Sequence, residues 1–372
     1  MRAVVALLCT SLVAMTGLAA TPKPAMKAAD NIIYLSTWPH TVRMVDIDQG
    51  KVVGEIPLSS DVARTLILTP DKKSLYAQSL RDNCIVTVDL EARKETDKFC
   101  LNTDTVTNRI GGLTLDPTGK FLYAILVVIT KQLDHYEVSY PKLAMIDIAE
   151  KKIARAVDYP KDLDKPGFRE QMRVSPDGKS LYLIRQSVLV FNTSDLKFSK
   201  KIELSNPIAP PGMDNLSLNL MNDPNEPKGK LIGVFTASDP YVHREVFGIG
   251  EIDLSSQTYE WTPVGPAAAS MEPLLLTPDR SLGYTVAVTG THGDRITEFW
   301  VFDMKTRKIV NKKPFLGRTR LNFGMTADGK YLLIYNAGFE VEVYDSKTLS
   351  LLNTISLGGD NTSNLLVMPR GE

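Results

Sequence analysis

Two turn signatures recur along the whole chain, and their repetition limits the fold more than any other feature of the sequence. The first is an apolar residue, an Asp or Asn, and a polar turn that leads into a second alternating strand, as in VDIDQGKVVGEI. Its seven copies begin at Val45, Val88, Ile146, Phe191, Ile252, Phe302 and Tyr344. The second is a turn such as SPDGKSLY, which begins at Thr69, Asp116, Ser175, Thr277 and Thr326, with a weaker version at Asp223. Self-similarity at intervals of roughly 40 to 60 residues indicates one structural unit repeated along the chain.

The recurring acidic residue of the first signature has a structural explanation. It is found at Asp46, Asp89, Asp147, Asp253, Asp303 and Asp345, with Asn192 in the fourth copy. Such a side chain at the end of a strand can accept a hydrogen bond from the backbone N–H two residues on, which fixes a hairpin turn. In the second signature, Pro sets the first turn angle and Gly tolerates the left-handed one. Both signatures therefore predict structural turns, not catalytic positions.

The two ends of the chain complete the repeat pattern. LLVMPRGE, from Leu365, supplies a strand and turn, and NIIYLSTW, from Asn31, supplies the strand that should follow them. A ring closed by strands from both ends leaves no open sheet edge. Period-two alternation dominates, without sustained helical periodicity. The prediction is an all-β chain forming one seven-bladed β-propeller, each blade a four-stranded antiparallel sheet. Two β-sandwiches, the alternative, would explain neither the seven copies nor the complementary termini.

The N-terminal segment reads as an export signal. Residues 1–20 carry one Arg and then apolar and small residues, which predicts a signal peptide cut near Ala19 or Ala20. A retained membrane anchor is the alternative reading of this stretch. Residues 21–30 form a predicted flexible leader and residues 31–372 the propeller, with no membrane span in the mature chain. The chain has 43 basic and 43 acidic residues, so its charge gives no reason to expect nucleic acid as a partner. The expected location is the periplasm.

Cys84 and Cys100 are the only cysteines outside the predicted signal peptide. They flank the turn of the second repeat, and folding that hairpin about Ala92 sets them opposite one another to within about a residue. Directly opposed strand positions are close enough for a bridge, and exported proteins retain disulfides. We expect a disulfide, with two separately buried thiols as the alternative.

Two gaps between repeats are longer than the rest, residues 126–142 and 205–247. Inserted loops on a scaffold are common sites of binding, and mixtures of aromatic, His and polar residues are enriched at protein interfaces. The candidates for a subunit interface or a cavity wall are His135 and Tyr136 in the first insertion and Tyr241 and His243 in the second. Loop packing is the alternative role for all four residues.

Catalytic motifs are absent from the sequence. None of the four His residues lies in a zinc-like pattern, so no metal ligand is assigned, although a site assembled from different blades stays open. The chain has no CxxCH run for covalent c-type haem and no GxSxG nucleophile elbow. We therefore assign no catalytic residue and no cofactor to this chain.

Particular segments resemble one family of subunits. The repeats are similar to the YVTN and methylamine-dehydrogenase heavy-chain propellers in general. LDHYEVSYPKLAMIDIAEKKIARA from Leu133, VFTASDPYVHR from Val234 and the ending LLNTISLGGDNTSNLLVMPRGE resemble, in order and spacing, the β subunit of quinohaemoprotein amine dehydrogenase. The likeness runs over essentially the whole predicted mature chain, and its weight lies in the collinear pattern because no single motif is diagnostic.

The resemblance implies a non-catalytic subunit of an oxidoreductase that deaminates primary amines. In that family a small γ subunit carries cysteine tryptophylquinone and an α subunit carries two c-type haems. The propeller holds the γ subunit and closes one wall of the cavity that receives the amine. Two other functions stay open: a stand-alone periplasmic propeller that binds a protein or envelope ligand, and a propeller lactonase.

Overall fold

The computed structural model describes residues 31–167, 170–204, 213–221, 223, 225–239, 241–242, 244–317, 321–335, 338–361 and 363–369. The predicted signal peptide and leader, residues 1–30, lie outside this part of the chain, as does His243. The regular secondary structure of the described residues consists of β-strands and one 3-10 turn, η1 (His292–Asp294), which agrees with the all-β prediction.

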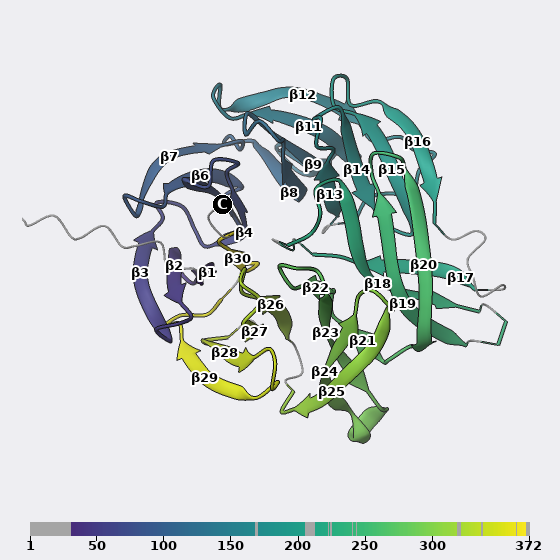
Figure 1. The fold of residues 1–372 in the computed structure, drawn as a ribbon. Coiled ribbons are helices and arrows are strands. Elements are labelled where there is room, and N and C mark those ends of the chain that lie inside the picture. The colour runs from purple at the N-terminus through teal and green to yellow at the C-terminus, as the bar shows by residue number, and fades with distance from the viewer. Residues whose placement is uncertain are drawn as a thin grey trace, which may run out of the picture.

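The strands form seven antiparallel sheets arranged in a ring, so the predicted seven-bladed propeller is confirmed (Figure 1). The first four sheets are β30 (Leu366–Val367), β1 (Ile32–Thr37), β2 (Thr41–Asp46), β3 (Lys51–Pro57); β4 (Ala63–Leu68), β5 (Ser74–Ser79), β6 (Cys84–Asp89), β7 (Lys94–Cys100); β8 (Val106–Leu115), β9 (Phe121–Lys131), β10 (Tyr136–Val138), β11 (Lys142–Asp147), β12 (Lys152–Asp158); and β13 (Gln171–Val174), β14 (Ser180–Ile184), β15 (Ser187–Asn192), β16 (Phe198–Glu203). The other three are β17 (Asp214–Asn219), β18 (Lys230–Ser238), β19 (Glu245–Asp253), β20 (Thr258–Pro266); β21 (Ser270–Met271), β22 (Leu275–Leu276), β23 (Leu282–Thr289), β24 (Ile296–Asp303), β25 (Lys308–Phe315); and β26 (Asn322–Met325), β27 (Tyr331–Tyr335), β28 (Glu340–Asp345), β29 (Leu351–Ser356).

Two sheets depart from the predicted four strands. In the third sheet, β9 runs past the end of the blade and pairs with the additional strand β10, with Tyr136 opposite Lys131. In the sixth sheet, the inner strand is split into β21 and β22, with Pro273 between them. Proline has no N–H to give to a neighbouring strand, which accounts for the interruption.

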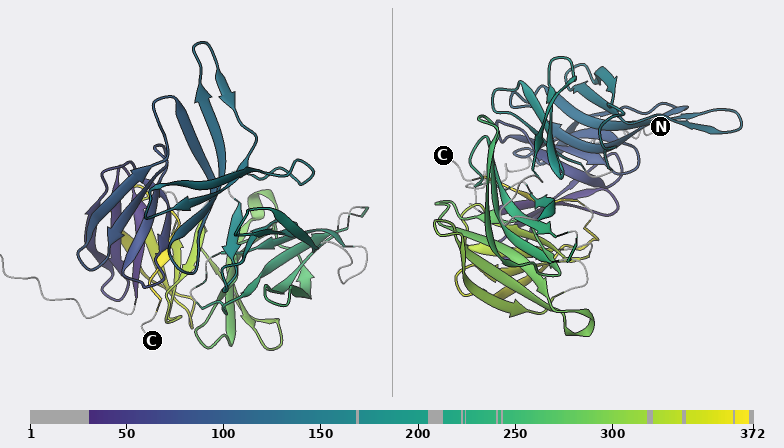
Figure 2. Two further views of the ribbon diagram at one scale, coloured as in Figure 1. Left: turned by 90° about the horizontal axis from the view of Figure 1, so that it is seen from above. Right: turned by 90° about the vertical axis from the view of Figure 1, so that its right-hand side faces the viewer.

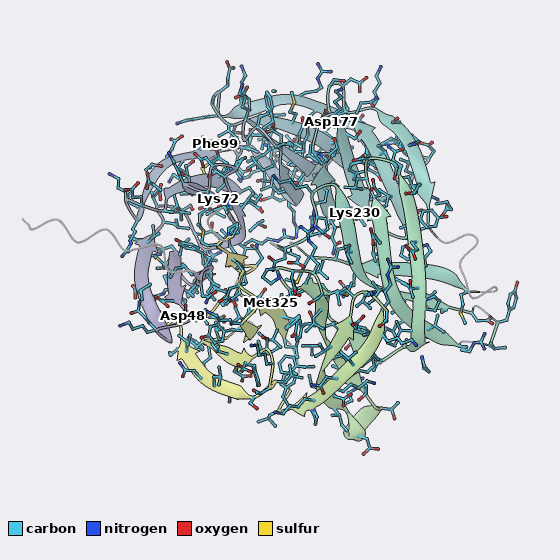
Figure 3. All side chains as sticks on the ribbon, viewed as in Figure 1. Asp48, Lys72, Phe99, Asp177, Lys230 and Met325 are labelled. Carbon is cyan, nitrogen blue, oxygen red and sulfur yellow. A yellow bond between two sulfur atoms is a disulfide. The ribbon has the colours of Figure 1, made fainter. Side chains whose placement is uncertain are left out.

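The ring is closed by the two ends of the chain, as predicted. The C-terminal strand β30 pairs antiparallel with β1, with Val367 opposite Ile33. The next sheet is joined to this one by a side chain: Asn364 accepts a hydrogen bond from Leu66 N–H (2.8 Å) and donates to Leu66 C=O (3.2 Å). In Figure 3, Met325 of the inner strand β26 lies near the middle of the ring and Phe99 of the outer strand β7 near its rim.

Each residue of the Asp series is the last residue of the third strand of its sheet. The carboxylates accept backbone N–H bonds mainly from the residue three positions on, one position later than predicted: Gln49 N–H bonds Asp46 at 2.9 Å and Thr306 N–H bonds Asp303 at 2.7 Å. The fourth copy differs because Asp195, not Asn192, accepts the side-chain bond in that turn, from Lys197 N–H.

The second signature closes the turn between the first two strands of a sheet. In the fourth sheet, Ser175 Oγ accepts the N–H of Ser180 at 2.9 Å and donates to Asp177 at 2.5 Å. Gly178 has a positive φ of 73°, and Lys72 holds the same turn position at 60°. Figure 3 labels Lys72 and Asp177 in two of these turns.

Antiparallel order separates two faces of the ring. The first strand of each sheet ends at the second signature and the third strand ends at the first signature, so both kinds of turn lie on one face, here the turn face. The connections between second and third strands, and those leading to the next sheet, lie on the opposite face, here the loop face. The first long insertion and, from the second, the connection between β18 and β19 lie on the loop face.

Apolar side chains between neighbouring sheets form the core. One such cluster joins the sixth and seventh sheets, where Phe299 stacks on Phe315 with ring centroids 4.3 Å apart and meets Tyr344 edge-on at 4.9 Å. The middle strands are buried, whereas outer strands such as β7 alternate exposed and covered residues. The blades therefore stack by burial of apolar surface, which leaves the loops free to vary.

Candidate functional site

The first insertion forms a hairpin that stands clear of the ring (Figure 2). His135 and Tyr136 lie at its far end, and the side chain of Tyr136 is 66% exposed. His135 Nδ1 lies 2.6 Å from Asp134 Oδ1 and its Nε2 lies 3.8 Å from Glu137 Oε1. The structure thus brings together these two predicted site residues, in a position that points away from the core.

Tyr241, the third candidate, lies in the connection between β18 and β19 and is 90% exposed. Its backbone N–H donates to Asp239 Oδ1 at 2.8 Å, which holds the turn but leaves the ring in solvent. Tyr136 and Tyr241 belong to different sheets, and within the described residues no hydrogen bond or ring contact joins them. The candidates are therefore separate points on one face, not a compact site.

Exposed apolar side chains gather on the loop face. In the described part of the chain, ten of the thirteen large apolar residues that are exposed lie in or beside its connections: Trp38, Leu80, Leu133, Tyr136, Val138, Tyr241, Val242, Ile296, Leu316 and Phe339. The other three, Val310, Leu351 and Leu352, lie on outer strands. These residues come from the connections of several different sheets.

A cavity of about 580 Å³ is lined by residues of three neighbouring sheets, the fourth, fifth and sixth. We call it the three-sheet cavity. It is lined by Glu170, Gln171, Ile184, Arg185, Gln186, Ser217, Leu218, Asn219, Val234, Thr236, Ala237, Ser238, Glu245, Ala268, Ala269, Ser270 and Met271. Its size falls in the range of small-molecule pockets, and the described residues that line it include no aromatic side chain.

Some polar groups of the three-sheet cavity have hydrogen-bond or ion-pair partners, and others have none among the described residues. Arg185 is held by Glu170 (Nε to Oε1, 3.4 Å) and donates to Asp164 C=O at 2.8 Å. Gln171 donates through Nε2 to Leu220 C=O at 2.9 Å, but its buried Oε1 has no donor among the described residues. The Glu245 carboxylate has neither an ion-pair nor a hydrogen-bond partner in that part of the chain.

Three half-buried carboxyl groups near the inner strands have raised pKa values. Burial raises the pKa of Glu272 to about 7. Burial also raises the pKa of Glu226 to about 7 and that of Asp223 to about 6, although both accept backbone N–H bonds. Asp223 Oδ2 accepts the N–H of Leu276 in the next sheet at 2.7 Å. Asp223 thus joins the weakest copy of the second signature to the neighbouring sheet, whereas Glu226 accepts the N–H of Ile232 in its own sheet.

These carboxyl groups and the three-sheet cavity were missed by the sequence reasoning. The one available signal was the fourth turn, DPNEPKGK, whose departure from the Pro-Asp-Gly pattern places extra acids there. Within the described residues, no group of three His, Cys, Asp or Glu side chains could hold a metal ion. No helix in the same part of the chain is long and apolar enough to cross a membrane.

Cys84 and Cys100 are directly opposite each other in the pairing of β6 with β7, and they form a disulfide. The bridge ties the third and outer strands of the second sheet at their loop-face end. It lies on a different sheet from the three-sheet cavity, so we expect it to stabilise the second sheet.

Comparisons with known proteins give the fold. No family model matches the chain, and no curated protein matches it. Solved structures do match. Kuenenia stuttgartiensis hydrazine synthase shares 15% identity over 84% of this chain and 90% of its own, with a TM-score of 0.52. Dihydro-haem d1 dehydrogenase NirN in complex with DHE shares 16% identity over 94% of this chain and 78% of its own, with a TM-score of 0.54. A functionally unknown protein from Desulfotomaculum acetoxidans DSM 771 shares 13% identity over 92% of this chain and 100% of its own, with a TM-score of 0.57.

Proposed function

We propose that this chain is the non-catalytic propeller subunit of a periplasmic quinohaemoprotein amine dehydrogenase. In this role it holds the small quinone-bearing γ subunit and closes one wall of the cavity in which a primary amine is oxidatively deaminated. The cysteine tryptophylquinone and the c-type haems belong to the γ and α subunits, so this chain supplies the scaffold and the docking surface.

The observation that carries the proposal is the concentration of exposed apolar side chains on the loop face. Leu133, Tyr136 and Val138 stand on the projecting hairpin, and Tyr241 and Val242 stand on a second connection of the same face. Burying such side chains against a partner yields about 25 cal/mol for each Å² removed from water. Aromatic anchors flanked by polar residues are typical of the centres of protein interfaces.

The choice of partner is supported by the segment resemblance. LDHYEVSYPK and VFTASDPYVHR, two segments that resemble the amine dehydrogenase β subunit, supply the projecting hairpin and the connection that carries Tyr241. The resemblance and the apolar residues therefore fall on the same elements. A dehydrogenase, NirN, is also among the solved structures with a similar fold.

The test is to purify the tagged full-length protein from its native host and record its subunits and absorption spectrum. We expect a haem-containing polypeptide and a small quinone-bearing polypeptide to co-purify, and the quinone and haem bands to change when a primary amine is added. A colourless monomer that binds neither polypeptide would contradict the proposal.

A variant of the projecting hairpin locates the interface. Leu133→Asp with Tyr136→Asp should release the γ subunit, because two exposed apolar contacts are replaced by charge. Val310→Asp, an exposed apolar position on the outer strand β25, is the matched control and should leave the complex intact. Equal loss of the complex in both variants would place the interface elsewhere.

A second candidate function, a stand-alone periplasmic binding module, is favoured by the three-sheet cavity, which is large enough for a small ligand. It predicts a monomer that co-purifies with a small molecule and without haem. The same purification therefore separates the two functions.

A further inference from the structure

We propose that strand β10, on the projecting hairpin, pairs along its outer edge with an extended segment of the protein that docks on the loop face. The inference rests on the proposed function for the presence of that protein. It adds the kind of contact that holds the hairpin, which is a strand added to the edge of the third sheet.

The pairing of β10 with β9 fixes which backbone groups face outward. Gln132 N–H donates to His135 C=O at 2.9 Å, and Ser139 N–H donates to a carbonyl of β9 at 2.8 Å. Hydrogen-bonded and non-hydrogen-bonded positions alternate along an antiparallel pair, so Tyr136 and Val138 are non-hydrogen-bonded against β9. The N–H and C=O groups of these two residues therefore point away from β9, and we call them the β10 edge.

No described segment of the chain covers the β10 edge. The outer strand β12 runs beside β11 only as far as Asp158, and Tyr159 N–H then donates to Pro141 C=O at 2.9 Å. Within the described residues, no hydrogen bond reaches the outward N–H or C=O groups of Tyr136 and Val138. The hairpin also stands clear of the ring (Figure 2). The strand position beyond β10 is thus accessible to another chain.

The opposite edge of the same projection is covered. Here β8 pairs with the far side of β9, and Val106 N–H donates to Thr103 Oγ1 at 3.1 Å while Val106 C=O accepts the Thr103 N–H at 2.8 Å. Asn108 N–H donates to Asn102 Oδ1 at 2.8 Å. Folded proteins cover their sheet edges because an open edge pairs with other chains. The contrast between β8 and β10 indicates that the β10 edge is kept for a partner.

The side chains of β10 set the chemistry of the added strand. Tyr136 and Val138 lie on one face of β10, because alternate residues of a strand share a face, and they are 66% and 63% exposed. Residues of an added strand that lie directly opposite them contact these side chains. Apolar residues at two alternate positions of the partner segment would therefore bury apolar surface in addition to forming main-chain bonds.

Glu137 selects the residue between those two positions and disfavours a second copy of this chain. Its side chain is 62% exposed. Against an added strand Glu137 takes a non-hydrogen-bonded position, where opposing side chains are closest. Two copies of β10 paired antiparallel over all three residues would set Glu137 opposite Glu137, and like charges in direct opposition are destabilising. The occupant is therefore a partner segment with an apolar, a basic and an apolar residue in succession.

Hydrogen exchange at single-residue resolution tests this pairing, with the isolated full chain and the purified native complex as the two samples. In the isolated chain, the amides of Tyr136 and Val138 should exchange rapidly because they face solvent. In the complex, both should exchange slower by about tenfold or more, because pairing protects an amide until the strand opens. The Val106 amide, which is bonded to Thr103, is the control and should exchange at the same rate in both samples.

A proline substitution tests the backbone contact separately from the side chain. Val138→Pro removes an outward N–H that makes no bond to β9, and edge strands tolerate proline. Val138→Thr is the matched control because it keeps the N–H and the branched shape. The Kd for the partner should be about tenfold higher for Val138→Pro than for Val138→Thr, since a main-chain bond is lost. Equal urea midpoints should show that both variants keep the fold.

The outcomes separate this inference from the proposed function. If Tyr136 and Val138 exchange equally fast in the complex and the isolated chain, and both Val138 variants bind the partner equally, the inference is overturned and the proposed function stands. Protection by a partner with neither haem nor quinone would support the strand pairing and contradict the proposed function. Protection in a dimer of this chain alone, measured by sedimentation, would overturn the choice of partner. A wild-type chain that binds no protein would remove both proposals.

Discussion

Cys84 and Cys100 face each other across the hairpin of β6 and β7 and are joined by a disulfide, with a sequence separation of 16 residues. A bridge of this loop length restricts the unfolded chain and contributes about 3 kcal/mol to the free energy of unfolding. We therefore expect Cys84→Ala with Cys100→Ala to lower the free energy of unfolding by about that amount, measured by urea denaturation.

Reduction provides the control for this prediction. Dithiothreitol should lower the urea midpoint of the wild-type protein and leave that of the double variant unchanged. A wild-type midpoint that does not respond to reductant would show that the two sulfur atoms contribute only by packing.

Asp279 should make the protein sensitive to acid. Hydrogen bonds from the Thr277 hydroxyl, the Ser281 N–H and the Ser281 hydroxyl hold the pKa of this carboxyl at about 2. Because the folded-state pKa lies below that of the unfolded chain, near 3.9, its contribution to stability is present above pH 4 and is lost as the pH falls toward 2.

Asp279→Asn isolates this effect. The difference in urea midpoint between wild type and variant should be largest at pH 6 and should shrink between pH 4 and pH 2. Glu91→Gln, at an exposed position in the turn between β6 and β7, serves as the control. If the difference in urea midpoint between the wild type and Asp279→Asn is the same at pH 6 and pH 3, the stability of this turn does not depend on the carboxylate charge.

The turns and the ring closure could be predicted from sequence because each depends on neighbours along the chain. Asp303 follows an alternating strand and caps the turn directly after it, so its role can be deduced from local spacing. The pairing of Cys84 with Cys100 follows from the two-residue period of one hairpin. The pairing of β30 with β1 could also be predicted, because the C-terminal segment supplies a strand and turn and the segment from Asn31 supplies the strand that should follow them.

The candidate site could be predicted only in part, because it depends on how separate sheets meet. Tyr136 and Tyr241 stood out as aromatic residues in long insertions, and both are exposed on the loop face. The three-sheet cavity is lined by residues of three different sheets, and no local sequence pattern shows that these segments meet. Glu272 could not be singled out from sequence either, because its raised pKa depends on burial by neighbouring strands.

Glu272 should cause a loss of stability at higher pH. Burial raises the pKa of this carboxyl to about 7, above the value near 4.3 in an unfolded chain. Between these values the folded protein binds more protons than the unfolded chain, so the free energy of unfolding falls as the pH rises from about 4.5 to 7. Glu272→Gln keeps the shape of the side chain without its charge.

The difference in free energy of unfolding between Glu272→Gln and the wild type should therefore depend on pH. The variant should gain stability over the wild type between pH 5 and pH 8 by on the order of 1 kcal/mol, measured from urea curves at both values. A difference that stays constant across this range would mean that the Glu272 carboxyl is solvated enough to ionise normally.

Asn364 should contribute to the closure of the ring, because it bridges two sheets that share no backbone pairing at this point. Its side chain bonds both the N–H and the C=O of Leu66, a buried residue on the inner strand β4. Asn364→Ala leaves both backbone groups without these partners, and we expect the free energy of unfolding to fall by about 2 kcal/mol. Asn353→Ala, an exposed position on the outer strand β29, should change it by less than about 0.5 kcal/mol. Equal urea midpoints for Asn364→Ala and wild type would show that the pairing of β30 with β1 closes the ring without this bridge.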